Sequence, residues 1–521
     1  MRREEEMNRR YVMGREKEYR QRLKYQVASV RKKTLENQIA VELKGHLGMS
    51  ETEARLLAVR MSRWLLTRPE VRGPEQIIVE ATAGRHSFIR NGRGSTTKVR
   101  LTPFAPEDLD LQLEQGLPSL QVGRMLRMIE EAYAQDALVS AKQLSRLLNL
   151  TPTALRQRLQ ALRELGIWAP IQGLGRAARA QGGQLRSTWA MARYLEGMAP
   201  GEIQRAAAIS RERWQELKYR FAAVAKRVQS GEFHPSDPEA ASWVELIQCT
   251  RDSLLDSLVQ ESPASLLPGD EWAELRAELA HDFGLTPVKI RALRELLEEL
   301  RTELIGRRAD CEVVYWAVAA TEPAGKPLEA CRLVPTKLTL LDPADVAGET
   351  PNRVSGMKFT KLVRYATQAK FQGAYLTYAD LAYLLGIHTE AIRRLIQTHP
   401  ELVVPLRGQE CDIGRGVTHR RQIIELYLQS YTETEIVARS GHSYESIGNY
   451  IKEFAAVLVL AERGMGPTLI RRVLGRSLKL VKVYLELVRA YTGPEYALRL
   501  QHLRQVFLAH ADQVQKRGLV P

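Results

Sequence analysis

The chain has 521 residues, of which 44% are hydrophobic, so it is long and apolar enough for several domains with cores of their own. This composition excludes a largely disordered protein. Lysine and arginine number 76 against 61 aspartate and glutamate, and the net charge of +15 favours an anionic partner, most simply double-stranded DNA. No apolar run approaches the roughly 18 residues that a membrane-spanning helix needs, and the N-terminus is too charged for a secretory signal.

None of the four cysteines stands in a C-x-x-C pair, which argues against a zinc site and for a reducing compartment. The chain also has no Walker A sequence, no glycine-rich dinucleotide fingerprint and no H-E-x-x-H motif. We therefore expect a cytoplasmic, nucleoid-associated protein without a metal ion, a cofactor or a membrane partner. A second copy of the chain or another protein remains open as a further partner.

The first 33 residues are strongly basic, with 12 lysines and arginines against 5 acidic residues. This segment predicts either a helix that lies on a phosphate backbone or a solvated extension.

The rest of the chain contains one pattern twice. The apolar positions of residues 138–159 recur in residues 375–396 at a constant displacement of 237, and the run Phe-Ala-Ala-Val of 221–224 recurs at 454–457. Chance matches would not keep nearly one displacement over half a chain, so we infer a tandem duplication with small deletions. A duplicated unit mimics a homodimer within one chain, with a pseudo-two-fold axis.

Each copy has the same predicted order of elements. A helical segment comes first, near 34–68 and near 271–305, and a β-hairpin and a run of helices follow. The expected fold is mainly α, with tandem helix-turn-helix or winged-helix-like units and a small β-hairpin in each half. The expected segments are a basic N-terminal helix or extension (1–33), the first copy (34–230), a linker (231–270), the second copy (271–463), and a further helix-turn-helix with a C-terminal helix (464–521).

One type of helix-turn-helix unit has five regularly spaced apolar positions. Its turn falls at Asn149 in the first copy and at Gly386 in the second, where glycine suits a left-handed backbone. Thr151 and Thr389 are placed to cap the second helix. That helix should present side chains that reach base edges or phosphates. These are Arg156, Gln157 and Arg158 in the first copy, and Arg393, Arg394 and Gln397 in the second.

A second type of unit has an isoleucine seven residues before a serine, which would cap the second helix. It occurs three times, with serines at Ser210, Ser443 and Ser477. One such pattern predicts little, but five helix-turn-helix candidates in a basic chain favour DNA binding. The candidate DNA contacts of this type are Arg211, Arg213 and Lys218; Tyr444, Asn449 and Lys452; and Arg476, Lys479 and Lys482.

Between the two types of unit lies a basic, glycine-containing connector, which suits a loop or wing that follows phosphates. In the second copy it supplies the candidate contacts Arg407, Arg415 and Arg420. Asp412, Arg415 and His419 are also the weak candidates for catalysis, because an acid and an imidazole on a glycine loop could hold a metal or assist phosphodiester attack. In the alternative, Asp412 orders the loop, Arg415 binds phosphate, and His419 caps or packs at the start of the next helix. The first copy has Arg179, Gly182 and Arg186 instead, so the sequence favours a protein without catalytic residues.

The second half resembles a prokaryotic family known as Domain of Unknown Function sixteen-seventy. The residues that carry the resemblance include QGAYLTYADLAYLL (372–385), VPLRG (404–408), DIGRGVTH (412–419) and GHSYESIGNYIKEF (441–454). The first half looks like a diverged copy that lacks the DIGRGVTH string. The resemblance implies a protein with several helix-turn-helix units and implies no reaction.

The leading hypothesis is a sequence-specific DNA-binding protein, either a transcriptional regulator or the DNA-recognition factor of a mobile element. Two alternatives stay open: a transposase, recombinase or nuclease that uses these units for targeting, and a helical scaffold that binds other proteins.

Overall fold

The protein is mainly helical, with a three-stranded antiparallel sheet in each half. Its chain divides into two compact units: a first unit of residues 1–317, 335–362 and 379–389, and a second unit of residues 318–334, 363–378 and 390–521. The computed structural model describes residues 18–67, 71–84, 95–172, 183–231, 238–250, 271–305, 308–322, 326, 328–342, 345, 353–399, 402, 404–410, 417–440, 444–476 and 478–516.

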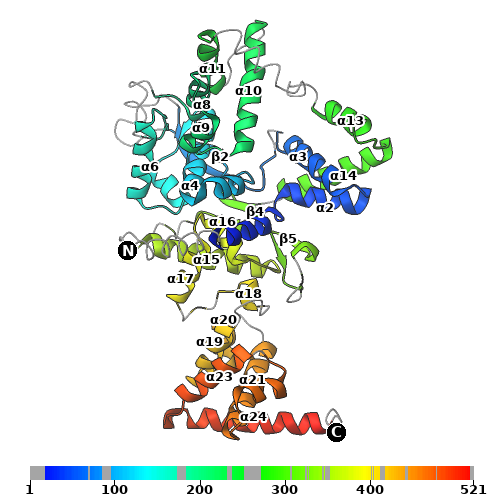
Figure 1. Ribbon diagram of the computed structural model, residues 1–521, viewed down its shortest axis with the longest axis vertical. Coiled ribbons are helices and arrows are strands. Elements are labelled where there is room, and N and C mark those ends of the chain that lie inside the picture. Colours follow the sequence, from blue (N-terminus) through cyan, green and yellow to red (C-terminus); the bar gives the residue numbers. More distant parts are fainter. Residues whose placement is uncertain are drawn as a thin grey trace, which may run out of the picture. The chain divides into compact units, whose positions relative to one another are not determined.

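Two helical hairpins, one from the start of each copy, pack together in the first unit (Figure 1). The rings of Trp64 and Trp272, one from each hairpin, lie 5.0 Å apart. Gly48 ends the first helix with a left-handed φ of 66°, and the Ser50 hydroxyl accepts from the Glu53 N–H at the start of the next. The hairpins comprise α2 (Leu35–Leu47) with α3 (Glu51–Thr67), and α13 (Glu271–His281) with α14 (Pro287–Ile305).

Each copy then forms the expected β-hairpin and adds a third strand. The order is β2-β1-β3 in the first sheet and β5-β4-β6 in the second. In the first sheet Ile77 pairs with Leu101 and Thr82 with Leu138. The third strands have only two residues each, too few for an alternating pattern. The strands are β1 (Ile77–Ala83), β2 (Thr96–Leu101), β3 (Ala137–Leu138), β4 (Glu312–Ala319), β5 (Leu333–Thr339) and β6 (Ala374–Tyr375).

The first helix-turn-helix unit of each copy turns where it was predicted to turn, but in the second copy Thr389, expected as the cap, is the first residue of the second helix. Both turns are left-handed, with φ of 55° at Asn149 and 63° at Gly386. The Thr151 hydroxyl caps the second helix by accepting from the Ala154 N–H. The helices are α4 (Asp108–Ala134), α5 (Ala141–Leu147) and α6 (Pro152–Glu164) in the first copy, and α15 (Arg353–Phe371), α16 (Tyr378–Leu385) and α17 (Thr389–Gln397) in the second.

The chain returns from this unit in the same way in both copies. The Gln172 N–H donates to the Val139 carbonyl, and the Arg407 N–H donates to the equivalent Leu376 carbonyl, both at 2.9 Å. Among the described residues of the first copy four helices follow, and the last lies within the range expected as a linker: α8 (Arg186–Leu195), α9 (Pro200–Ala207), α10 (Arg211–Gln229) and α11 (Pro238–Gln248).

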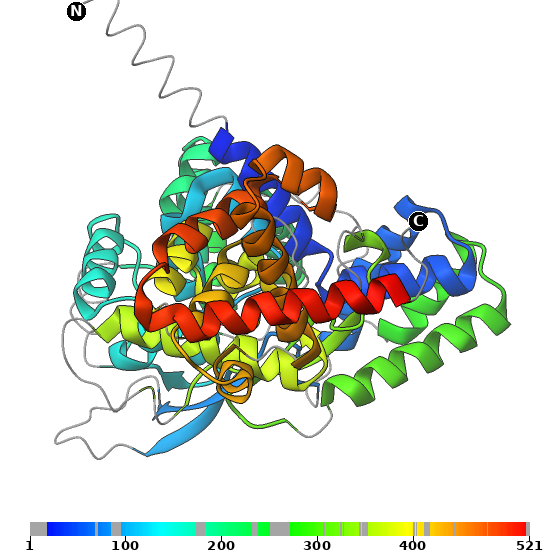
Figure 2. The same ribbon diagram turned by 90° about the horizontal axis from the view of Figure 1, so that it is seen from below.

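The C-terminal helices of the second unit share one apolar core, which includes Ile436, Phe454, Ile470 and Tyr484. Figure 2 shows the long α24 crossing the other helices of this group, and it contacts α19 and α21. No helix among the described residues is long and apolar enough to cross a bilayer. The remaining helices are α18 (Arg407–Glu410), α19 (Val417–Leu428), α20 (Glu433–Ser440), α21 (Tyr444–Glu462), α22 (Pro467–Leu474), α23 (Leu478–Ala490) and α24 (Ala497–Lys516), with short 3₁₀ turns η2 (Leu328–Ala330) and η4 (Pro494–Tyr496).

The two copies meet, within the first unit, at the starts of β1 and β4. The Ile78 N–H donates to the Asp310 carbonyl at 2.7 Å, and the Val314 N–H donates to the Pro74 carbonyl at 2.8 Å. Ile78 and Val314 are separated by 236 residues, as are Pro74 and Asp310. Each copy therefore donates and accepts the same hydrogen bond. Such reciprocity is the mark of a two-fold relation, and it confirms the predicted pseudo-two-fold axis.

The arginines that precede these strands are reciprocal as well. Arg72 donates to the Ala309 carbonyl at 2.9 Å, and Arg308 donates to the Gly73 carbonyl at 2.7 Å. Ala309 and Gly73 are again equivalent at a displacement of 236. We call this set of backbone and arginine hydrogen bonds the seam between the copies.

Candidate nucleic-acid interface

Helix α6 has one buried face and one exposed face. Leu155 and Leu162 are buried against the rest of the first copy, whereas Arg156 and Gln157 are exposed, as predicted. Arg158 differs from the prediction because it is half-buried. It donates to the Ala154 carbonyl and to the Gln121 side chain, so it packs inward and is not on the outer face.

Helix α17 has the same division. Ile392, Leu395 and Ile396 are buried, and three polar side chains lie on the exposed side: Arg393, Arg394 and Gln397. Arg393 is 2.5 Å from Glu390 on the preceding turn, a surface pair that leaves the side chain accessible.

The predicted basic contacts of helix α10 are less accessible than those of α6 and α17. Its Ser210 cap forms as predicted, with the hydroxyl accepting from the Arg213 N–H. Arg213 is paired with Glu216 at 2.6 Å, and Lys218 is half-buried with its ammonium 5.9 Å from the centre of the Tyr194 ring. Arg211 is exposed, but its backbone N–H donates to Glu114. Nearby acids would weaken the attraction of this helix for phosphate.

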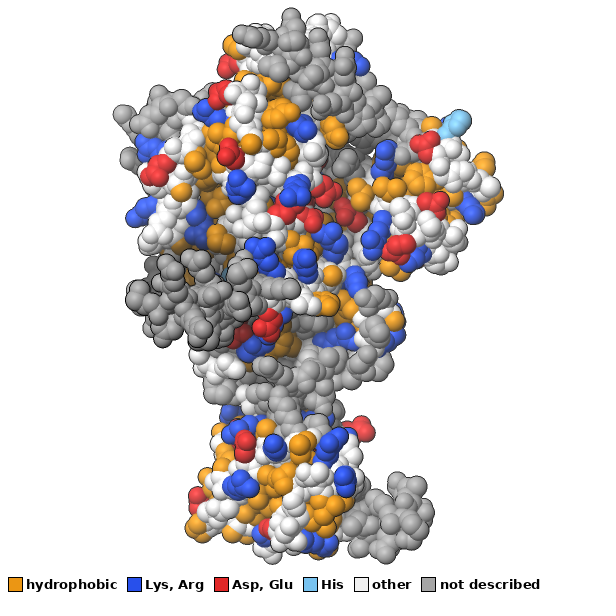
Figure 3. Space-filling model, viewed as in Figure 1, with side chains coloured by type: hydrophobic (Ala, Val, Ile, Leu, Met, Phe, Trp, Pro, Cys, Tyr) orange, Lys and Arg blue, Asp and Glu red, His pale blue; other side chains and the backbone are white. Residues whose placement is uncertain are grey.

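The second unit brings four of the predicted contacts into one groove of about 580 Å³. Asn449 and Lys452 come from α21 and Arg476 comes from the turn before α23, so both C-terminal helix-turn-helix units contribute. These three residues are exposed, and Arg420 is buried at 9% exposure. On the face drawn in Figure 3, Lys and Arg side chains outnumber Asp and Glu over the C-terminal helices. We call this feature the C-terminal groove.

A carboxylate at the base of the C-terminal groove holds two of its arginines. Glu453 accepts from Arg420 at 2.7 Å and from Arg476 at 2.5 Å. Arg420 also lies over the Tyr450 ring, with 4.8 Å between the guanidinium carbon and the ring centre. We expected Arg420 to contact phosphates from an exposed loop. It is instead a buried residue that supports the groove through its ion pair with Glu453.

Arg407 likewise lies in the interior and not on an exposed wing. It is only 7% exposed, and its guanidinium donates to the Cys331 sulfur at 3.2 Å. This burial was not predictable from the sequence, because arginine side chains are mostly exposed to solvent.

The remaining predicted contacts have varied positions. Tyr444 is 53% exposed and Lys482 is exposed. Asp412 and Arg415 lie outside the described residues, as do the side chains of His419 and Lys479. In the part of the chain that the structure describes, no group of three or more His, Cys, Asp or Glu side chains could hold a metal ion.

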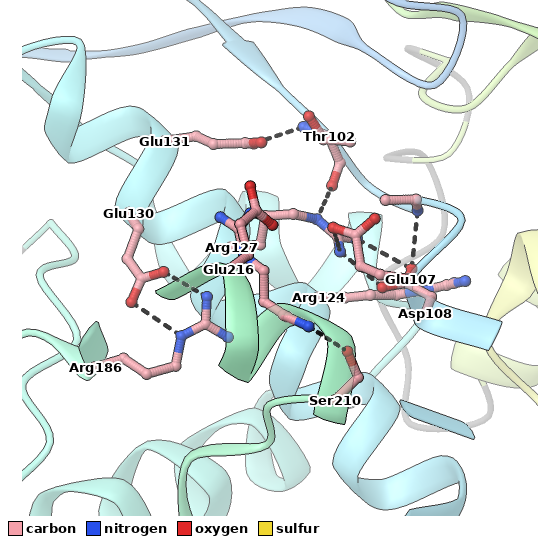
Figure 4. A network of polar contacts seen from close by, with 12 residues as sticks. Thr102, Glu107, Asp108, Arg124, Arg127, Glu130, Glu131, Arg186, Ser210 and Glu216 are labelled. Carbon is pink, nitrogen blue, oxygen red and sulfur yellow. Dashed lines mark hydrogen bonds and ion pairs between the residues drawn. The ribbon is translucent and has the colours of Figure 1, made fainter. Parts of the chain in front are cut away.

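The sequence did not reveal a polar cavity of about 590 Å³ in the first unit (Figure 4). Asp108, at the start of α4, accepts from Arg124 and Arg127, each at 2.7 Å. Burial opposes ionisation of Asp108, but the two guanidiniums hold the pKa of its carboxyl below the ordinary value. Burial raises the pKa of Glu131, against the opposing effect of Arg127.

The opposite wall of this cavity is closed by another ion pair, in which Arg186 donates to Glu130 at 2.6 Å (Figure 4). Most charges that line the cavity are thus paired with one another, and the network fixes α4 to its neighbours. From the sequence, only the position of Asp108 could have drawn attention to this network, because this residue recurs as Asp345 in the second copy.

Comparison with known proteins yields one match. The family model described as "Protein of unknown function (DUF1670)" matches residues 74–224 and again residues 279–487. No curated protein and no solved structure matches the chain. The two matched regions cover well over half of the sequence and overlap one copy each, and the second also extends into the C-terminal segment, to residue 487. The chain therefore belongs to the DUF1670 family and contains its sequence in tandem.

Proposed function

We propose that the protein binds double-stranded DNA sequence-specifically through its helix-turn-helix units, as a transcriptional regulator or as the DNA-recognition factor of a mobile element. The observation that carries this proposal is the exposed polar face of the second helix in each first-type unit. On α6 this face holds Arg156 and Gln157, and on α17 it holds Arg393, Arg394 and Gln397. Arginine and glutamine form bidentate hydrogen bonds with base edges in the major groove.

The order of elements around α6 also supports a winged-helix reading. The helix α4, the strand β3, the pair α5–α6 and a returning segment follow one another, and the Gln172 N–H of that segment donates to the Val139 carbonyl. The second copy has the same order and the same return at Arg407. In winged helices the second helix of the pair enters the major groove.

The C-terminal groove supports phosphate contact. Lys452 on α21 and Arg476 before α23 are exposed cations that line it. Contacts of this kind fix the register of a protein on the duplex without reading its sequence. Base-reading helices and phosphate contacts together are what sequence-specific binding of a duplex would need.

The test is fluorescence anisotropy of the full chain with duplexes selected from a random pool and with unselected duplexes, at about 0.15 M salt. We expect the logarithm of the binding constant to fall with the logarithm of the salt concentration with a slope of about −3 or steeper, because each released counterion contributes about −0.9. R393A and R394A should weaken binding of selected duplexes more than of unselected ones, since a lost base contact costs roughly 1–3 kcal/mol. R291A removes the same charge from the exposed side of α14 and should change neither affinity.

Three results would overturn parts of this proposal. Absence of binding in the presence of competitor DNA would favour the protein-binding scaffold. Equal loss on both classes of duplex would make Arg393 and Arg394 phosphate contacts. Magnesium-dependent nicking of supercoiled DNA would favour the nuclease or recombinase.

A further inference from the structure

The turns of the two first-type helix-turn-helix units touch each other inside the first unit. Asn149, at the first turn, donates to the Leu385 carbonyl at 3.0 Å. Gln121 donates to the carbonyl of Gly386, at the second turn, at 2.9 Å. Asn149 and Gln121 are 2% and 8% exposed, so these hydrogen bonds are shielded from water.

Two basic side chains complete this contact in a reciprocal way. Arg124 of the first copy donates to the Tyr383 carbonyl of the second at 2.8 Å. Lys361 of the second copy donates to the Arg146 carbonyl of the first at 2.6 Å. Arg124 and Lys361 are separated by 237 residues, and so are Arg146 and Tyr383.

These pairs distinguish a rotation from a translation. If the second copy were shifted along an axis without a two-fold rotation, a residue would contact its partner in one direction only. Here the same contact is made in both directions, at the turns and again at the seam. The turns of the two units are therefore related by the pseudo-two-fold axis.

The reciprocal contact is also buried. Arg124 and Lys361 are 3% and 1% exposed. Buried polar groups favour one arrangement because each alternative would leave a donor or acceptor unsatisfied. Within the first unit, the two turns are therefore joined by a specific, buried contact.

We infer that the DNA target of this protein is an inverted repeat with one fixed spacing, and that a single chain reads both half-sites. A two-fold axis in a protein matches a two-fold axis in its DNA site, and half-sites are then near a multiple of one helical turn, about 10–10.5 base pairs. The inference rests on the proposed function, since it names the arrangement of the bases that the same helices read.

The repeat should be imperfect. Residues 18–31 form a helix, the N-terminal helix, and its Tyr19 and Gln26 contact the start of α17. The Gln26 amide donates to the Thr389 hydroxyl at 2.9 Å, and the ring centres of Tyr19 and His388 are 5.9 Å apart. The equivalents of His388 and Thr389 in the first copy, Thr151 and Pro152, are exposed. One reading helix thus begins in contact with the N-terminal helix, whereas the other begins with two exposed residues, so the half-sites should differ in sequence.

The experiment begins with selection of binding sites for the full chain from a random duplex pool. Synthetic duplexes then present the selected half-site once, as an inverted repeat and as a direct repeat of equal spacing. We expect at least about tenfold tighter binding to the inverted repeat than to either of the others, because the second half-site is bound intramolecularly. We also expect this gain to disappear when the spacing is changed by five base pairs, which places the half-sites on opposite faces of the duplex.

A variant separates the contact between the turns from the reading surface. N149G combined with Q121A removes side-chain hydrogen bonds between the turns. Glycine keeps the left-handed turn, since its equivalent is Gly386 with a φ of 63°. This variant should bind the single half-site as the natural protein does but lose its preference for one spacing. Q157A, on the exposed face of α6, should instead weaken binding of the repeat and keep the spacing preference.

The outcomes separate the two proposals. Equal affinity for inverted and direct repeats, or protection of only one half-site in a footprint, would overturn the inverted repeat and leave DNA binding intact. A spacing preference that survives N149G with Q121A would show that the contact between the turns does not set the spacing. Selection that enriches no sequence at all would overturn the proposed function, and this inference with it.

Discussion

The Nζ atom of Lys33 lies 2.5 Å from the Oδ2 atom of Asp380, and both side chains are fully buried. The other carboxylate oxygen accepts from the Tyr315 hydroxyl at 2.7 Å. Lys33 follows the N-terminal helix and Asp380 belongs to α16, so the pair attaches the N-terminal segment to the second helix-turn-helix unit. A buried ion pair of this kind contributes to stability only while both partners are present.

We therefore predict that K33M strongly destabilises the protein, because it leaves the Asp380 carboxylate buried without its cation. The expected loss in the free energy of unfolding is about 3–5 kcal/mol. The double variant K33M with D380N should recover part of the loss, since the amide carries no charge and can still accept from Tyr315. Denaturant titration measures both. K24M, at an exposed position of the N-terminal helix, is the control. A loss for K33M no larger than for K24M would contradict the prediction.

A second prediction concerns the seam. Arg72 and Arg308 occupy equivalent positions and donate to each other's copy, so R72A and R308A should cause comparable losses of stability. Each removes hydrogen bonds from a charged donor, which are worth about 1.5–3 kcal/mol. R291A, on the exposed side of α14, should leave the unfolding midpoint unchanged. A large loss in only one of the two seam variants would indicate that the reciprocal contacts differ in weight.

The third prediction is that the stability of the protein depends on pH through Glu75. Burial raises the pKa of Glu75 to about 8, with Glu36 and Glu107 adding to the rise and Arg308 opposing it. The value in the unfolded chain is about 4.3. The folded state favours the neutral form of Glu75. The contribution of Glu75 to the free energy of unfolding is therefore complete below about pH 4.3 and is lost as the pH rises through about 8.

Glu75 directly follows Pro74, whose carbonyl belongs to the seam. We expect unfolding midpoints to fall between pH 6 and pH 9 in the natural protein, and the fall to be smaller in E75Q. E80Q, at an exposed position of β1, should behave like the natural protein. An identical pH profile for E75Q and the natural protein would rule out Glu75 as the source.

Much of the fold was predictable because local signals and the duplication agreed. Asn149 and Gly386 marked left-handed turns at equivalent positions, and Ser210 and Thr151 capped the helices that they were expected to cap. A repeated pattern is also a second measurement of the same fold, so weak signals in one copy were supported by the other.

The burial of charged side chains was not predictable. Arg407, Arg420 and Arg158 read as exposed cations, yet each finds an acceptor or an aromatic ring that lies far away in the sequence or on a neighbouring helix. Periodicity identifies the apolar face of a helix but cannot show which polar residue another element will cover. The seam was likewise not predictable. The constant displacement shows which residues of the two copies are equivalent, but it does not show which residues of one copy donate hydrogen bonds to the other.

The last prediction separates structure from binding within the C-terminal groove. Arg420 is buried on Glu453, whereas Lys452 is exposed at the rim. R420A should lower the unfolding midpoint, since it takes one of two cations from a half-buried carboxylate. K452A should leave the midpoint unchanged but weaken DNA binding and make the salt slope shallower by about 0.9, the value of one phosphate contact. K289A, an equal charge change on the exposed side of α14, is the control. If K452A and K289A have the same affinity and slope, the groove does not contact phosphate, and the reading helices α6 and α17 must supply the binding alone.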